Sequence, residues 1–232
     1  MDHRALNEKI RAAHDDCLIT GCLGQRFIAD GLEQHTITIE GTPGNALGAY
    51  LSGGHIHVCG NAQDAVGDTM NDGQIVISGN VGDAVGYAMR GGEIYIKGNA
   101  GYRAGVHMKA YESKQPLLVI GGRVGSFVGE YQAGGTILVL GLHTDGKPIA
   151  GFFPCTGMHG GKMIFRGDVS GIVFPQQTTS RIADANDLAG LRPVITRFCA
   201  LFDHDADALL ADPYTIITPD SRNPYQQLYV AN

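Results

Sequence analysis

The chain has 232 residues, a formal net charge of −6 and only 17 Lys plus Arg, a balance that argues against a general nucleic-acid surface. No stretch reaches the roughly 20 continuous apolar residues of a membrane span, and the start Met1-Asp2-His3 has no signal-peptide core. The five cysteines are scattered without a Cys-x-x-Cys pair, which suits a reducing compartment. We therefore expect a cytoplasmic protein with no membrane partner.

Glycine recurs at a fixed interval along most of the chain. Gly41, Gly60, Gly79 and Gly98 are each nineteen residues apart, and each follows a short apolar run. Gly122 and Gly141 are again nineteen apart, and Gly167 closes a last, longer unit. The interval from Gly98 to Gly122 is five residues longer than nineteen, with an insertion at 110–115. The interval from Gly141 to Gly167 is seven residues longer. A period of this length is typical of a solenoid with turn glycines, and loops inserted in a solenoid often carry function.

Apolar residues precede each turn glycine in two columns with period-two alternation, which places both columns on one face of a strand. The columns are Ile37, Ile56, Ile75, Ile94, Leu118, Ile137 and Met163, then Ile39, Val58, Ile77, Ile96, Ile120, Val139 and Phe165. A second ladder facing them is Leu47, Val66, Val85, Ala104 and Val128, with Leu51, Met70, Met89 and Met108. The pattern predicts an all-β fold, a single-stranded right-handed parallel β-helix of about seven coils. We expect the β-helix at 36–175, a lead-in and cap at 1–35, and a helical segment with an extended tail at 176–232.

The outward strand positions become apolar in the later coils, so this side of the sheet needs a cover. These positions are Thr38, His57, Val76, Tyr95, Val119, Leu138 and Ile164. Helical spacing of apolar residues from Pro193 to Phe202 predicts an internal helix that begins at the proline and covers the sheet. A partner subunit is the other possible cover. A short helix at 205–210, a strand or extended run at 214–218 and an extended tail at 219–225 complete the expected C-terminal part.

Other polar residues have simple structural interpretations. Asn61, Asn80 and Asn99 follow turn glycines, where asparagine tolerates left-handed backbone and bonds its own backbone. His55 and His57 lie two residues apart on a strand and could bind a metal on one face, which Cys59 continues. Because no carboxylate is in sequence range to complete such a site, we expect outward, solvated histidines.

Three blocks in order resemble the GXGXG domain of glutamate synthase. They are Gly101-Tyr102-Arg103-Ala104-Gly105-Val106-His107-Met108-Lys109, Gly129-Glu130-Tyr131-Gln132-Ala133-Gly134-Gly135 and Gly157-Met158-His159-Gly160-Gly161. The resemblance runs from residues 24–28 to 222–225, and is closest to stand-alone subunits such as those of N-methylglutamate synthase. Gln132 departs from the pattern, which usually has Met there.

The resemblance implies a non-catalytic scaffold. In glutamate synthase an amidotransferase domain releases ammonia from glutamine, and an FMN domain with an iron-sulfur cluster reduces the iminoglutarate. The resemblance therefore implies two partners, a glutamine amidotransferase-like subunit and an FMN-binding subunit, with FMN and the iron-sulfur cluster on the partners and no cofactor, metal or catalytic residue here. A homo-oligomer is also possible.

The same blocks supply the residues that could contact a partner. Arg103, His107 and Lys109 could bind an anion or a carboxylate of a partner. Their structural alternative is a charged rim beside the insertion. Glu130 and Tyr131 should lie near them, because their coil stacks on the coil that contains His107. His159 completes the candidates, and its expected structural role is a corner residue that bonds its own backbone.

Two alternatives stay open. The same β-helix occurs in the C subunit of formylmethanofuran dehydrogenase and in a related formyltransferase/hydrolase complex, although the insertion at 110–115 and the Gly-Glu-Tyr block favour the glutamate synthase branch. An independent enzyme or sugar-binding β-helix is disfavoured, because tryptophan is absent and the acidic residues are scattered.

Overall fold

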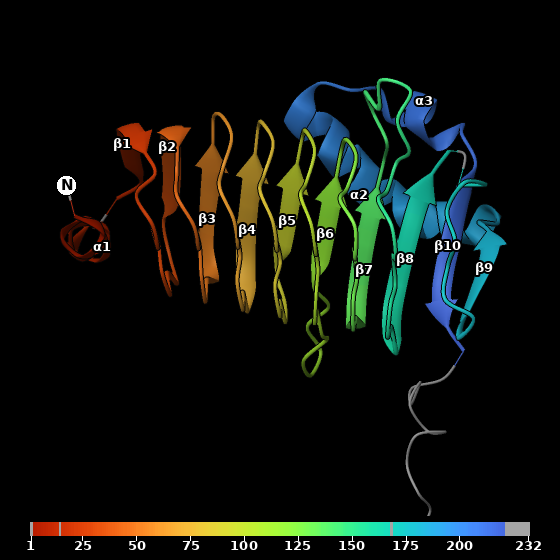
Figure 1. Cartoon of the computed structure of the whole chain (residues 1–232). Helices are drawn as coiled ribbons and strands as arrows, with labels where there is room; N and C mark the ends of the chain where they lie inside the picture. The colour runs from red at the N-terminus through yellow and green to blue at the C-terminus, as the bar shows by residue number, and fades with distance from the viewer. Residues whose placement is uncertain (1, 14, 168, 221–232) are drawn as a thin grey trace, which may run out of the picture.

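The computed structural model describes residues 2–13, 15–167 and 169–220, and these form a rod of stacked coils (Figure 1). The elements in chain order are α1 His3–Ala12, β1 Cys17–Leu23, β2 Thr36–Thr42, β3 Ser52–Val58, β4 Asp72–Ile77, β5 Glu93–Ile96, β6 Leu117–Ile120, β7 Ala133–Val139, β8 Gly160–Arg166, β9 Thr178–Ile182, α2 Ala185–Phe202, α3 Ala206–Leu210 and β10 Tyr214–Pro219. No described helix has the length and apolarity needed to cross a membrane.

One sheet runs the length of the rod in the order β1-β2-β3-β4-β5-β6-β7-β8-β10-β9. Strands β1 to β8 pair in parallel, and the predicted columns stack in register, as in Ile37 opposite Ile56 and Ile56 opposite Ile75. The parallel β-helix is thus confirmed, but the count of coils differs slightly. Six complete turns, about one fewer than expected, connect the seven strands from β2 to β8. In addition, β1 adds a parallel strand within the expected lead-in.

The core lies between this sheet and a wall of irregular backbone opposite it. Both inward columns of the sheet and both columns of the second ladder are almost completely buried, as predicted. Gln132 occupies the methionine column between Met108 and Met158 and is fully buried. Its Nε2 donates to the carbonyl oxygens of Gly134 and Gly135, each at 3.2 Å, whereas its Oε1 has no hydrogen-bond partner among the described residues.

Asparagine side chains tie successive corners together. The Oδ1 of Asn61 accepts the backbone N–H of Asn80 at 2.8 Å, and the Oδ1 of Asn80 accepts that of Asn99 at 2.7 Å. The expected bond to each residue's own backbone is therefore replaced by one to the next coil. The corner glycines fit beneath this ladder, because a Cβ on Gly98 would lie 2.3 Å from the Asn80 Oδ1. This contact leaves no room for a side chain.

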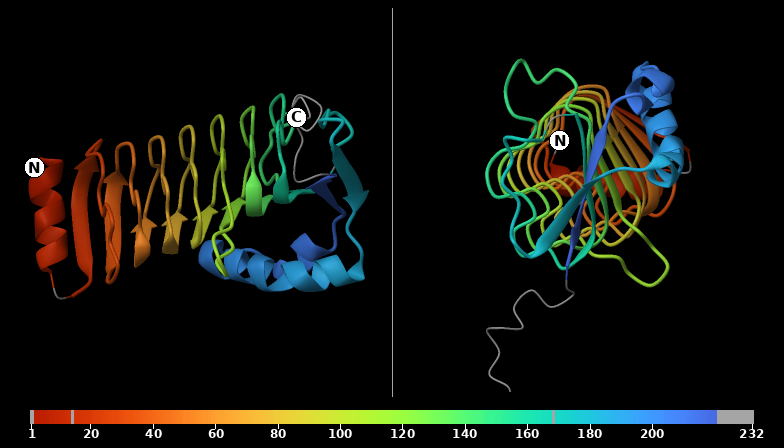
Figure 2. Two further views of the ribbon diagram at one scale, coloured as in Figure 1. Left: turned by 90° about the horizontal axis from the view of Figure 1, so that it is seen from below. Right: turned by 90° about the vertical axis from the view of Figure 1, so that its right-hand side faces the viewer.

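Helix α2 covers the outer face of the sheet over the later coils (Figures 1 and 2). A second apolar cluster joins the outward residues Val76, Tyr95, Val119, Leu138 and Ile164 to Leu191, Ile195, Phe198, Cys199 and Phe202 of α2. The predicted internal cover is thus confirmed. The helix removes from water the apolar surface that would otherwise need a partner subunit.

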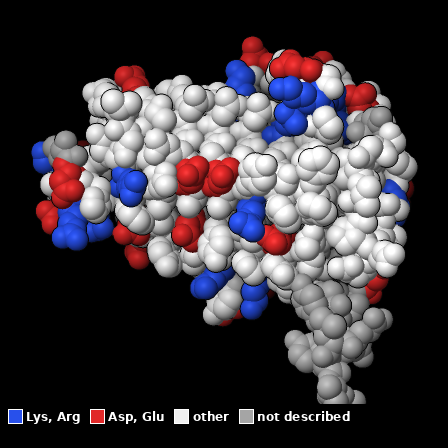
Figure 3. Space-filling model, viewed as in Figure 1, with Lys and Arg blue, Asp and Glu red and all other residues white. Residues whose placement is uncertain are grey.

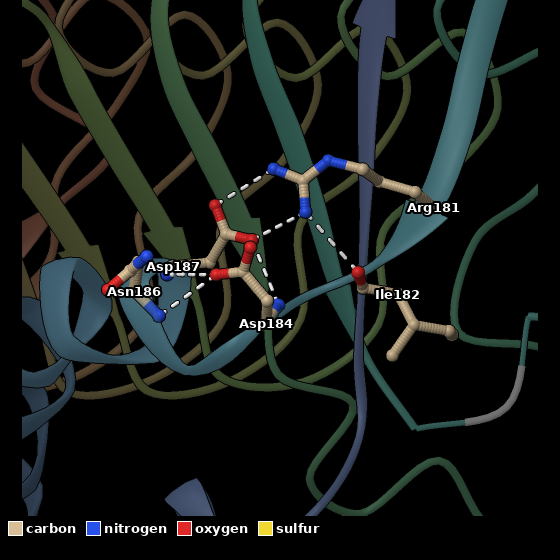
Figure 4. Close-up of polar contacts among 5 residues, drawn as sticks. All are labelled: Arg181, Ile182, Asp184, Asn186 and Asp187. Carbon is tan, nitrogen blue, oxygen red and sulfur yellow. Dashed lines mark hydrogen bonds and ion pairs between the residues drawn. The ribbon is translucent and has the colours of Figure 1, made fainter.

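The start of α2 was predicted wrongly. The helix begins at Ala185, where Asp184 and Asp187 form a reciprocal capping box (Figure 4), and Pro193 lies inside it. The Asp184 Oδ1 accepts the Asp187 N–H at 2.9 Å, and the Asp187 carboxylate accepts the Asp184 N–H at 2.9 Å. Arg181 adds two hydrogen bonds to the same carboxylate. This cap satisfies N–H groups at the helix start and stabilises about two additional turns of helix before the proline.

The two ends of the rod are closed differently. At the N-terminal end, Asn7 of α1 donates to the Phe27 carbonyl oxygen at 2.6 Å and accepts the Ala29 N–H at 2.8 Å. At the other end, the predicted short helix and strand are present as α3 and β10, and β10 pairs antiparallel with both β8 and β9. The tail beyond residue 220 lies outside the described residues.

Candidate protein interface

The wall opposite the sheet is built from backbone that alternates into the left-handed region. In the coil that contains His107, the residues with positive φ are Arg103 at 56°, Gly105 at 68° and His107 at 56°. The N–H groups of Arg103 and His107 donate to the following coil, at Ser126 and Glu130, whereas the Gly105 N–H donates back to Val85. The alternation lets one short segment hydrogen-bond to both neighbouring coils.

Two columns of the wall therefore carry side chains on left-handed backbone. The first column is Phe27, Ala46, Ala65, Ala84, Arg103, Phe127 and Phe153, and the second is Tyr50, Thr69, Ala88, His107 and Tyr131. Between residues 65 and 88 both columns hold only Ala or Thr. From residue 103 onward both hold large side chains, until Gly157 ends the second column.

A non-glycine residue in left-handed backbone costs roughly 1–2 kcal/mol. This cost applies to Arg103, His107, Phe127, Tyr131 and Phe153. Between the two columns runs a central column, also on left-handed backbone, which avoids the cost in most coils because it is glycine there, at Gly48, Gly67, Gly86, Gly105 and Gly129. Strain that is retained with bulky side chains points to a role for those side chains in function.

His107 is at the centre of one row of rings. Its imidazole stacks on the Tyr131 ring, with centroids 5.1 Å apart and an interplanar angle of 8°. On its other side the Tyr87 ring approaches edge-on at 6.0 Å. The row therefore continues across three successive coils.

Arg103 begins a second row. Its guanidinium lies 5.5 Å from the centroid of the Phe127 ring, and Phe127 stacks on Phe153 at 5.3 Å. The Arg103 Nε also donates to the Glu130 carboxylate at 3.0 Å. Because Glu130 directly precedes Tyr131, this ion pair joins the two rows. The contact of Arg103 with a ring and a carboxylate holds its planar group in one orientation.

We call this surface the aromatic face. It consists of Tyr87, Arg103, His107, Phe127, Tyr131, Phe152 and Phe153. Several of its rings are well exposed, with Phe152 at 77% and Phe153 at 62%. Charged side chains are sparse over the later coils on this side of the rod, whereas a few acidic and basic side chains lie nearer its middle (Figure 3). Exposed aromatic residues that are rigidly placed and surrounded by few charges are typical of a protein interface.

The structure brings together four of the six residues proposed from the sequence, namely Arg103, His107, Glu130 and Tyr131. Lys109 is exposed and takes part in none of these ring contacts. His159 is half-buried, and its Nδ1 lies 3.0 Å from the Gly157 carbonyl oxygen, as expected of a corner residue. Sequence reasoning missed Phe127, Phe152, Phe153 and Tyr87. The sequence did contain a signal. At the position two residues before the central glycine of each coil, Ala84 is followed in the next two coils by the large residues Arg103 and Phe127.

Cys155, His55 and His57 do not belong to the aromatic face. Burial raises the pKa of the Cys155 thiol to about 12, so this cysteine stays protonated in the core. His55 and His57 are exposed on the sheet, with the His57 Nε2 3.1 Å from the Ser78 Oγ. Within the described residues, no group of three His, Cys, Asp or Glu side chains could hold a metal ion.

Comparison with known proteins identifies the family. The profile of the family described as GXGXG motif matches residues 16–219, most of the chain. The chain belongs to the GXGXG family. An uncharacterized protein of Methanocaldococcus jannaschii is 44% identical over 243 aligned positions, which cover 99% of this chain and 93% of that protein. The family match confirms the relationship to glutamate synthase domains, and the six residues proposed from the sequence all lie within the matched part of this GXGXG chain.

Proposed function

We propose that this chain is the structural subunit of a glutamate synthase-like complex. In this proposal it holds a glutamine amidotransferase-like subunit and an FMN-binding, iron-sulfur oxidoreductase subunit in register, and the reactive groups belong to those partners. The family match supports the glutamate synthase relationship. The aromatic face is the observation that carries the scaffold role.

Two features of the aromatic face favour a protein partner over a small substrate. Its side chains are fixed by ring contacts across successive coils, as between His107 and Tyr131. Rigid aromatic side chains lose little conformational entropy when they bind, and they dominate the energetics of protein interfaces. The rings of the face also lie on the outside of the wall, while the inward ladder beneath them is completely buried.

Purification of the native complex tests the proposal. The chain is tagged at its own gene, isolated under mild conditions and analysed by mass spectrometry and by flavin absorbance. We expect an amidotransferase and a flavoprotein at fixed ratios, and formation of glutamate or an N-substituted relative from glutamine or an amine. Preparations that contain neither partner contradict the proposal. Recovery of a molybdenum or tungsten enzyme instead supports the formyl-transfer alternative.

A further inference from the structure

The longer insertion of the solenoid lies over a groove at the C-terminal end of the rod. The insertion at 142–148 projects from one edge of the rod, opposite the insertion at 110–115 (Figure 2). Two adjoining pockets lie against it, of about 530 and 490 Å³, and they share Pro148, Gly171 and Ile172. We refer to these two adjoining pockets together as the groove.

One end of this groove is apolar. Phe152, Phe153 and Val173 line it, and Val173 is 85% exposed. Because Phe152 and Phe153 also belong to the aromatic face, the groove continues the candidate protein interface. An apolar side chain of a bound segment would find partners here.

Cationic side chains also line the groove. Arg123 lines it and is oriented by a 2.8 Å hydrogen bond from its Nε to the Pro148 carbonyl oxygen. Lys147 lines the second pocket. Neither cation has an ion pair within the described residues, whereas Arg166 in the same pocket is paired with Asp212. No Asp or Glu is among the described residues that line either pocket, and Asp145 of the insertion is not among them.

From this arrangement we infer that the groove binds an extended segment of a partner protein, in which an aromatic or aliphatic side chain lies next to acidic residues. The inference deepens the proposed scaffold role and rests on it for the existence of a partner. Two cations without an acidic neighbour favour an acidic segment. The chain's own residues 221–232 fit this requirement poorly, since they contain Arg222 and no Asp or Glu.

A peptide library tests the inference on the full chain alone. Random dodecapeptides displayed on phage are selected on the wild-type protein and on the double variant Arg123→Glu/Lys147→Glu. A second double variant, Arg90→Glu/Lys97→Glu, makes the same change in charge at two exposed positions outside the groove. We expect the wild type and this control to enrich peptides that combine apolar and acidic residues, and the groove variant to lose that enrichment.

The affinity of one selected peptide, labelled with fluorescein, is then measured by anisotropy. The groove variant should bind about tenfold or more weakly, the fold-change expected from loss of a charge-assisted hydrogen bond. Phe153→Ser should also weaken binding, and the control should remain within about twofold of the wild type. Circular dichroism confirms that each variant is folded.

Several outcomes would overturn the inference. The first is a wild-type selection without acidic enrichment, and the second is equal enrichment by the groove variant. The third is a dimer of the wild type in sedimentation that the groove substitutions dissociate, because it would assign the groove to a second copy of this chain. The selection contains no amidotransferase or flavoprotein. Peptide binding with a failed native purification would therefore refute the proposed complex, while the chemistry of the segment that the groove binds would still be supported.

Discussion

The imidazole of His107 lies almost parallel to the phenol ring of Tyr131, with the ring centroids 5.1 Å apart. The two residues come from successive coils, and both have left-handed backbone, with φ of 56° and 54°. Their stacking holds one exposed ring, that of His107, against one half-buried ring, that of Tyr131. Such a preorganised pair should contribute to binding more than an isolated ring on the same wall.

Tyr131→Ser should therefore weaken partner binding by about tenfold or more, because aromatic residues in interfaces often contribute about 2 kcal/mol or more. Tyr50→Ser is the matched control, since Tyr50 is exposed in the same column with φ of 57° but lies in an early coil, outside the aromatic face. Titration calorimetry with the purified partner measures both. Equal losses for the two variants would remove the special role of the aromatic face.

Two glycines of the central column allow the cost of backbone strain to be distinguished from the cost of missing space for a side chain. Gly86 and Gly105 have φ of 67° and 68°, but a Cβ would lie 3.6 Å from Leu118 Cδ2 in the first case and 2.3 Å from Ile137 Cδ1 in the second. Gly86→Ala should cost about 1 kcal/mol from strain alone. Gly105→Ala should cost about 2–4 kcal/mol because it also overpacks the core. Urea denaturation compares the two, and similar costs would show that the core accommodates the added methyl group.

The cap of α2 should make the docking of this helix sensitive to acid. The Arg181 guanidinium, with the Asp184 N–H, holds the pKa of the Asp187 carboxyl well below its usual range. A carboxyl with a lowered folded-state pKa contributes stability that is present above its unfolded pKa, about 3.9, and is lost as pH falls further.

Thermal melts between pH 7 and pH 2 measure this effect. Asp187→Asn should lower the melting temperature at pH 7 and reduce its fall in acid. Asp207→Asn is the control, because Asp207 pairs with Arg192 at 2.8 Å but is largely exposed and caps nothing at the start of α2. If both variants show the wild-type dependence on pH, the capping ion pair is not responsible for it.

The cysteines should differ in their reaction with iodoacetamide. Cys59 is exposed, whereas Cys155 is fully buried and burial raises its pKa to about 12. At pH 8 the native protein should be alkylated at Cys59, and Cys155 should react only after denaturation, because the thiolate is the reactive form. Peptide mass spectrometry follows each site. Rapid native alkylation of Cys155 would mean that the last coil opens readily.

The sequence by itself determined the rod and its core. The nineteen-residue spacing of glycines such as Gly60 and Gly79, with the alternating isoleucine columns, predicts which residues lie above one another. This works because each coil of a solenoid contacts mainly its neighbours, so that periodicity in the sequence directly gives the contacts. The burial of the later outward positions, such as Val119, also followed from their apolar character.

Only the tertiary structure decided how the wall and the insertions are arranged. The extra residues before Gly122 and Gly167 interrupt the period, so the contacts of Arg103 with Phe127 and of Phe127 with Phe153 are not readable from fixed spacing. The intrinsic preferences of non-glycine residues disfavour left-handed backbone. In this wall it depends on hydrogen bonds to the two neighbouring coils. The groove likewise depends on tertiary structure, because residues of the insertion at 142–148 and Ile172, which no repeat spacing relates, line one pocket.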